Sequence, residues 1–362
     1  MKQKLIAAAV VGAFAAPAAF AQSTVNIYGL LNAEYGFVSQ PNNAAGLARH
    51  NADGFNSGAS RIGFKGEEKL GSGMSAWFQC ESDIRFLSGG TATSGTWCDR
   101  NSAIGLKGGF GSFFLGTWDS PLKQAVAKTR ILNETGWVGV QHLLLAGDTF
   151  KNSNRNAQSI NYETPKFGGF VARAQVTSTN AAFDKLDTTA TKGRHIGFGA
   201  DYSQGPLVVA AGMEKSDDNR AVVGGGGAGA EDTSYAIGAT YVFGAFKPGV
   251  TYTNQKAEDG LGGDLKKSAW NLALDWKITA PGTVRFGYTQ QSDYKGSEGA
   301  NDTGAKMWQV GYQHALSKRT VAGVSYARID NDNNGTANFT GLTNAVLGDN
   351  ASVVVFNLGH TF

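Results

Sequence analysis

The sequence predicts an all-β protein, an antiparallel barrel of 16 strands that cross a membrane. Three observations lead to this prediction. The N-terminus has the composition of a secretory signal peptide, the rest of the chain alternates apolar with small or polar residues, and short turns alternate with long polar loops. No later stretch approaches the roughly 18 consecutive apolar residues of a membrane-spanning helix, so strands must do the crossing.

The first 21 residues are expected to be a signal peptide. Lys2 and Lys4 form a short positive region, residues 5–16 are apolar, and residues 19–21 (AFA) have the small-x-small pattern of a cleavage site. The apolar run is shorter than the roughly 20 residues that a transmembrane anchor, the alternative, would need. Cleavage after Ala21 leaves residues 22–362 as one exported barrel domain.

The composition indicates no strongly charged partner. The chain has 32 basic and 29 acidic residues, and loss of Lys2 and Lys4 leaves 30 against 29, a mature net charge of +1. The basic residues are not clustered, which argues against nucleic-acid binding. Glycine accounts for 50 of the 362 residues, about twice its usual share.

Alternation with period two indicates the strands. In residues 270–278 (WNLALDWKI) the large apolar residues share one parity, and Asn271, Asp275 and Lys277 share the other. A soluble β-sandwich would also alternate. Aromatic residues at the ends of the apolar faces, and small, polar and charged residues on the opposite faces, favour a membrane barrel with a wet lumen.

The connections set the number of strands. Short ones are expected at 66–73, 107–112, 164–169, 203–206, 243–246, 280–283 and 315–319. Long ones are expected near 38–58, 82–99, 117–155, 177–193, 215–233, 254–268, 290–306 and 329–350. These connections imply 16 strands, with the alternation of short periplasmic turns and longer extracellular loops that outer-membrane barrels show.

Five stretches spread over the mature chain carry a family resemblance: 23–29 (STVNIYG), 60–71 (SRIGFKGEEKLG), 101–116 (NSAIGLKGGFGSFFLG), 159–170 (SINYETPKFGGF) and 359–362 (GHTF). They resemble the general porins of Gram-negative bacteria, of the β-proteobacterial and neisserial type. The resemblance implies a homotrimer in the outer membrane, in contact with lipid and lipopolysaccharide. It also implies that loop 117–155 folds into the barrel as a constriction. The expected function is passive diffusion of small hydrophilic solutes and ions, with no enzymatic activity, cofactor or metal.

The resemblance also suggests which residues line the constriction. Porins of this type place arginines on the barrel wall opposite acids on or near the third loop, and the matching positions are Arg61, Arg100, Arg155 and Glu81. Parity places Arg61, Arg155 and Glu81 on the inward face. Arg100 has outward parity, unless a bulge shifts the phase.

Converging guanidinium groups favour carboxylates and phosphates, so the pore is expected to be weakly anion-selective. The alternative is that these arginines only solvate a wet wall. A substrate-specific channel for phosphate or organic acids is the other reading within the same fold. An adhesin or an outer-membrane enzyme is disfavoured, because the sequence shows neither a plug domain nor a nucleophile with its base.

The third loop carries its own charges. Arg130 and Glu134 are further constriction candidates, and Lys123 and Lys128 lie on a stretch that is expected to begin as a short helix after Pro121. These bases would strengthen anion selectivity if they faced the lumen, but not if they bound the inner wall. The sequence leaves both possibilities open.

Cys80 and Cys98 are the only two cysteines. They flank the second loop on strands expected to be neighbours, so in an exported protein they are expected to form a disulfide, the alternative being two free thiols. A metal site is disfavoured, because two cysteines without nearby histidines form a poor ligand set.

Overall fold

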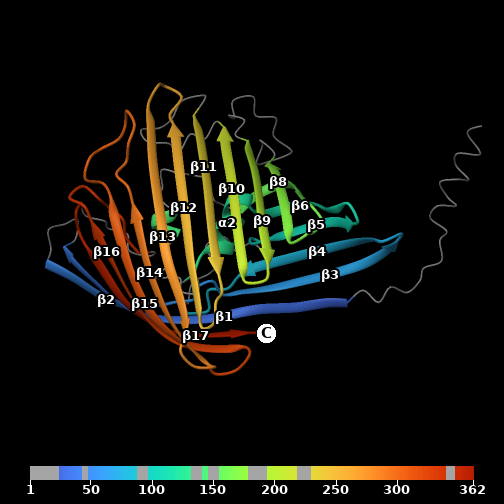
Figure 1. The fold of residues 1–362 in the computed structure, drawn as a ribbon, viewed down its shortest axis with the longest axis horizontal. Helices are drawn as coiled ribbons and strands as arrows, with labels where there is room; N and C mark the ends of the chain where they lie inside the picture. Colours follow the sequence, from blue (N-terminus) through green and yellow to red (C-terminus); the bar gives the residue numbers. More distant parts are fainter. Residues whose placement is uncertain are drawn as a thin grey trace, which may run out of the picture.

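The computed structural model describes residues 24–42, 48–87, 97–131, 141–145, 155–177, 194–217, 230–339 and 347–362. These residues form one closed antiparallel barrel (Figure 1). The strands are β1 (Thr24–Asn42), β2 (Ala48–Asn56), β3 (Arg61–Gly71), β4 (Met74–Asp83), β5 (Ser102–Gly108), β6 (Gly111–Asp119), β7 (Arg155–Glu163), β8 (Phe170–Thr177), β9 (His195–Gln204), β10 (Leu207–Asp217), β11 (Glu231–Tyr241), β12 (Phe246–Glu258), β13 (Asp264–Lys277), β14 (Gly282–Gln291), β15 (Ala305–Ala315), β16 (Thr320–Asn331) and β17 (Ala351–Thr361).

The barrel has 16 strand positions although 17 strands are described, because β2 and β3 share one position. The first half of β1 pairs with β3 and its second half pairs with β2. Every other strand pairs with its neighbours in chain order, and β17 pairs with β1 to close the ring. The predicted 16-stranded barrel is confirmed.

The first and last strands meet at the seam between β1 and β17. The backbone N–H of Gly29 donates to the carbonyl of Phe362, and the N–H of Phe362 donates to the carbonyl of Gly29, both at 3.1 Å. The Phe362 ring lies over Gly29, where a Cβ would come within 2.4 Å of the ring carbon Cζ. Gly29 therefore makes room for the terminal ring that completes the ladder.

The alternation of side chains separates an apolar outer face from a polar inner face. On β13, Leu272 and Trp276 are 48% and 41% exposed on the outside, whereas Asn271 and Lys267 are buried on the inside. Aromatic rings form two bands on the outer face. Tyr288 contacts both Trp270 and Trp308 toward the long loops, and Phe246 stacks on Trp276 toward the short turns. These bands are the aromatic girdles of a membrane-spanning barrel.

All seven predicted short turns are present within a few residues of the expected positions. Two of the predicted long loops are largely strand. Residues 38–42 form the end of β1 and residues 48–56 are the whole of β2, and the connection between β12 and β13 is only 259–263. In these strands the backbone pairing continues through polar residues beyond the apolar segment. Apolar alternation in the sequence therefore marked only the segment that crosses the membrane.

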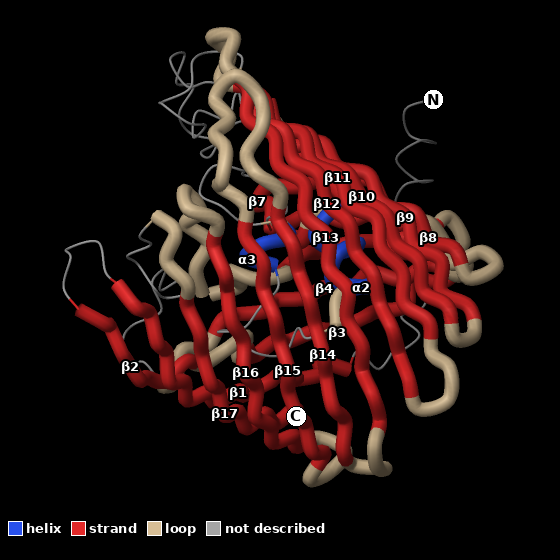
Figure 2. The backbone as a smooth tube through the Cα atoms, turned by 60° about the vertical axis from the view of Figure 1, so that its left-hand side comes forward, coloured by secondary structure: helices blue, strands red, loops and turns tan. Residues whose placement is uncertain are grey.

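Two short helices lie against inward-facing residues (Figures 1 and 2). Helix α2 (Pro121–Thr129) packs on β9, β10, β11 and β12, and α3 (Gln141–Leu144) contacts β13 and β14. The helix expected after Pro121 is present, and Ser120 caps it by accepting a hydrogen bond from the Lys123 N–H at 3.2 Å. None of the described helices is long and apolar enough to cross a membrane.

We expect Gly29→Ala to weaken the seam, because the added methyl group would collide with the Phe362 ring. Overpacking of this kind costs about 1–3 kcal/mol. The temperature at which the folded barrel loses its compact mobility in gel electrophoresis should therefore fall. Gly54→Ala is the matched control, because nothing lies within 4 Å of a Cβ at that position. Equal unfolding temperatures for the two variants would contradict the role of the terminal ring.

Candidate functional site

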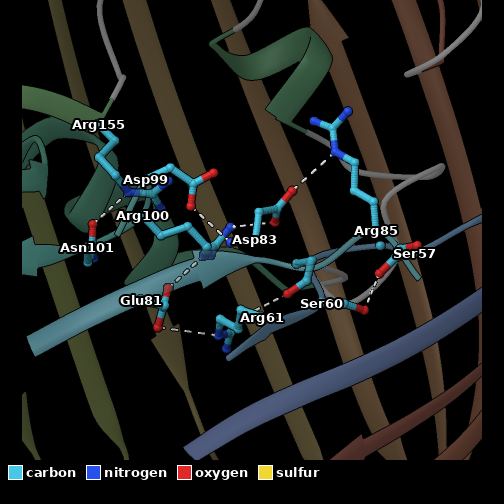
Figure 3. A network of polar contacts seen from close by, with 12 residues as sticks. Ser57, Ser60, Arg61, Glu81, Asp83, Arg85, Asp99, Arg100, Asn101 and Arg155 are labelled. Atoms are coloured by element: carbon cyan, nitrogen blue, oxygen red, sulfur yellow. Dashed lines mark hydrogen bonds and ion pairs between the residues drawn. The ribbon is translucent and has the colours of Figure 1, made fainter. Parts of the chain in front are cut away.

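A cluster of charged side chains lies where β3, β4, β6 and β7 meet the long loops (Figure 3). Neighbouring strands reach this edge of the sheet together, so residues far apart in the sequence converge here. We call this group the arginine cluster. It contains Arg61, Glu81, Asp83, Arg85, Asp99, Arg100, Asp119, Lys123 and Arg155, with five basic groups and four acidic ones.

Glu81 points inward from β4 and connects two arginines. Arg100 Nε lies 2.7 Å from Glu81 Oε1, while Arg61 Nε lies 3.7 Å from Oε2. The Tyr28 hydroxyl also donates to Oε2, at 3.1 Å. Arg100 therefore makes the closer ion pair with this carboxylate, and the Arg61 side chain remains 33% exposed.

Asp119, at the end of β6, is the second acidic centre. It lies 3.2 Å from Arg155 Nη2 and 3.0 Å from Lys123 Nζ. Asn101 links the two sides, because its amide donates to Asp119 at 3.0 Å and its oxygen accepts from Arg155 Nε at 2.8 Å. Burial lowers the pKa of Lys123, and the attraction of Asp119 partly opposes that shift.

The position of Arg100 in the cluster does not follow from strand parity. Parity placed it on the outward face unless a bulge intervened. The structure shows Arg100 in the connection before β5, which begins only at Ser102. Its backbone N–H donates to the Glu81 carbonyl at 2.9 Å, and its guanidinium lies beside the Glu81 side chain. The phase of β5 therefore does not apply to Arg100.

The disulfide-forming cysteines flank this connection. The structure joins Cys80 on β4 to Cys98, with their Cα atoms 4.8 Å apart and a sequence separation of 18. The Cys98 backbone N–H also donates to Ser82 Oγ at 2.8 Å. Together these bonds hold the segment that carries Arg100 against β4.

Of the third-loop candidates, Arg130 lies apart from the cluster. Arg130 follows the last turn of α2, at the end opposite Asp119, and the next residue, Ile131, packs against Ala273 of β13. Burial lowers the pKa of Arg130 to about 10, so its guanidinium stays charged at neutral pH. Glu134 lies outside the described residues.

The structure also places the two lysines of the third loop. Lys123 pairs with Asp119, and Lys128 pairs with Asp201 of β9 at 2.7 Å. Both therefore bind acids of the barrel strands, which is the second of the two possibilities that the sequence left open.

Asp83, Arg85 and Asp99 of the cluster were not singled out from the sequence, and neither was Asn101 beside it. Asp83 contacts both Arg100 and Arg85 at 3.4 Å, and Asn101 connects Arg155 to Asp119. Asp83 and Arg85 follow Glu81 at a spacing of two, so continued alternation along β4 was the signal that could have found them. No such signal marks Asn101, which acts from a connection.

The fold and this charge pattern can be compared with known proteins. The sequence model of the Gram-negative porin family matches residues 7–334. The chain is 33% identical to outer membrane porin protein 32 of Delftia acidovorans, over 89% of this chain and 87% of that one. It is 28% identical to an outer membrane porin protein of Bordetella pertussis, over 91% of this chain and 94% of that one.

A solved structure extends the comparison. The anion-selective porin from Comamonas acidovorans superposes with a TM-score of 0.78 at 26% identity, covering 94% of this chain and all of that chain. The closed barrel with its polar lumen and aromatic girdles, the match in sequence and the likeness to this solved structure all indicate the same family. The chain belongs to the Gram-negative porin family, whose members are outer-membrane channels and not enzymes.

Proposed function

We propose that this porin passes small hydrophilic solutes and ions by diffusion with a weak preference for anions, set by the arginine cluster. The observation that carries the proposal is the arrangement around Glu81. Arg100 occupies this carboxylate at 2.7 Å, while Arg61 lies 3.7 Å away, donates from Nη1 to the Ala59 carbonyl at 3.1 Å and keeps a side chain that is 33% exposed. A guanidinium is charged at any relevant pH and binds carboxylates and phosphates through parallel hydrogen bonds.

The preference is expected to be weak because the cluster is nearly balanced. Its four arginines face four carboxylates, Lys123 adds a positive charge that is paired with Asp119, and each of these basic groups lies within 4 Å of a carboxylate. Passing anions therefore meet a small excess of positive charge and not a deep binding site. The solved Comamonas relative, described as anion-selective, supports the same sign for this chain.

We also propose how the channel is exported and assembled. Residues 1–21 act as a signal peptide, and the mature barrel assembles as a homotrimer. Leu31 and Ala33 on the outer face of β1 offer a small apolar surface that suits contact between subunits.

Contact with lipopolysaccharide is supported by lysines on the outer face near the long loops. Lys215, Lys256 and Lys266 lie in one register row across β10 to β13, each within 2.7 Å of a carboxylate. Such a row, above the aromatic girdle, suits the phosphates of an outer leaflet.

We expect Arg61→Gln to shift the reversal potential toward the cation side. Two unit charges about 4 Å apart interact by about 1 kcal/mol even in water, so the anion-to-cation permeability ratio should fall a few-fold. The measurement is the reversal potential of single trimers in a planar bilayer under a tenfold KCl gradient. Arg285→Gln is the matched control, because it removes the same charge from an ion pair with Asp275 on β13 and β14, away from the cluster. Equal shifts in the two variants would show that the cluster is not the selective element.

Glu81→Gln should shift the reversal potential in the opposite direction. Removing the carboxylate that Arg61 and Arg100 share leaves more uncompensated positive charge, so anion permeability rises. The effect should be largest in dilute salt and small at 1 M, where the Debye length is only about 3 Å. A shift toward cations, or a shift that does not depend on salt, would contradict this assignment.

A further inference from the structure

Helix α2 lies on a part of the inner wall that lacks side chains. Five inward-facing glycines form this surface, which we call the glycine seat: Gly197, Gly199, Gly212, Gly238 and Gly249. A Cβ at Gly212 would lie 2.7 Å from the Pro121 carbonyl oxygen and 2.8 Å from the Leu122 Cα. A Cβ at Gly238 would lie 2.3 Å from Thr129 Oγ1. The helix backbone therefore approaches the sheet as closely as it does only because these positions are glycine.

The helix runs across the strands, and its length matches the width of the seat. Pro121 lies at Gly197 and Gly199 on β9, and Ile131, just past the helix, lies at Gly249 on β12. Three steps between neighbouring strands span about 14 Å, and nine helical residues rise about 13.5 Å. One helix thus covers four strands from end to end.

Polar contacts hold the helix on this seat. Lys128 Nζ lies 2.7 Å from Asp201 on β9, and Asp201 also pairs with Arg173 of β8. The hydroxyl oxygens of Thr129 and Thr251 lie 3.0 Å apart. The apolar side of α2 is fully covered, because Leu122 and Val126 are buried in contact with the wall.

We propose that the glycine seat sets the calibre of the pore. Without side chains at these positions α2 lies flush with the wall, and any added side chain displaces the helix into the lumen and narrows it. Because carbon atoms pack at about 3.5–4.0 Å, one methyl group at Gly212 requires a displacement of about 1 Å. The inference rests on the proposed function as a diffusion channel, and it assigns the width of that channel to the barrel wall.

The first test compares wild type, Gly212→Ala and Gly212→Val in single-channel conductance and in liposome swelling with sugars of increasing size. The expected result is a graded fall in conductance, larger for valine than for alanine, and a stronger loss of permeation for the larger sugars. Gly359→Ala is the control. Gly359 faces the lumen from β17, and the nearest atom to a Cβ there is the Asn32 side-chain oxygen at 3.3 Å. The conductance of the Gly359→Ala channel should therefore be unchanged. Unchanged or increased conductance in the folded Gly212 variants would overturn the inference, while a wild-type barrel that does not conduct would reject the channel itself.

A second test does not depend on whether a barrel with a larger residue at Gly212 can fold. In the double variant Thr129→Cys/Thr251→Cys, the neighbouring hydroxyls are replaced by thiols that lie close enough to be joined. Oxidation of the folded barrel should consume both new thiols, as thiol titration and mass spectrometry would show beside the existing Cys80–Cys98 bond. Two thiols that remain free after oxidation would show that α2 does not rest on the seat.

Discussion

The absence of water inside a bilayer is the constraint on which the rest of this structure depends. Every backbone N–H and C=O of a membrane-spanning strand needs a partner within the protein, and a sheet meets that need only by closing into a barrel. Here the closure is made by residues from the two ends of the ladder, Gly29 and Phe362, which exchange both backbone hydrogen bonds. Closure fixes the direction of each side chain, so apolar residues face lipid and the polar, small and charged residues are left to line the lumen.

The charged site follows from this arrangement. Antiparallel neighbours end at the same rim, so β3, β4, β6 and β7 bring their terminal charges together without a dedicated binding domain. Ion pairs neutralise some of the arginines in the cluster more fully than others. Arg100 neutralises Glu81 and Arg155 is held by Asp119, which leaves Arg61 and Arg85 as the guanidinium groups with the longer ion pairs and the more exposed side chains. A channel needs such weak sites, because a solute must be able to leave as readily as it enters.

Most of the barrel could be predicted from the sequence because period two is a local property. Parity predicted Arg61 and Glu81 on the inward face, and the short turns were located within a few residues. The failures lie where backbone geometry is set by distant partners. Arg100 stands in a connection, so parity did not apply, and Lys128 binds Asp201, 73 residues away. The β2 extension was missed because its polar residues pair beyond the apolar zone. The glycines that receive α2 had no sequence signal, since small residues line the lumen throughout.

The most direct measurement is the reversal potential of the purified wild-type channel in a planar bilayer under a salt gradient. A stepwise conductance with a reversal potential on the anion side, largest in dilute salt, is the predicted result. It would show an open aqueous pore whose field is set by exposed guanidinium charge. A reversal potential on the cation side would contradict the assignment of selectivity to the arginine cluster while leaving the pore intact. A folded barrel with no conductance would contradict the central claim that the lumen is an open path.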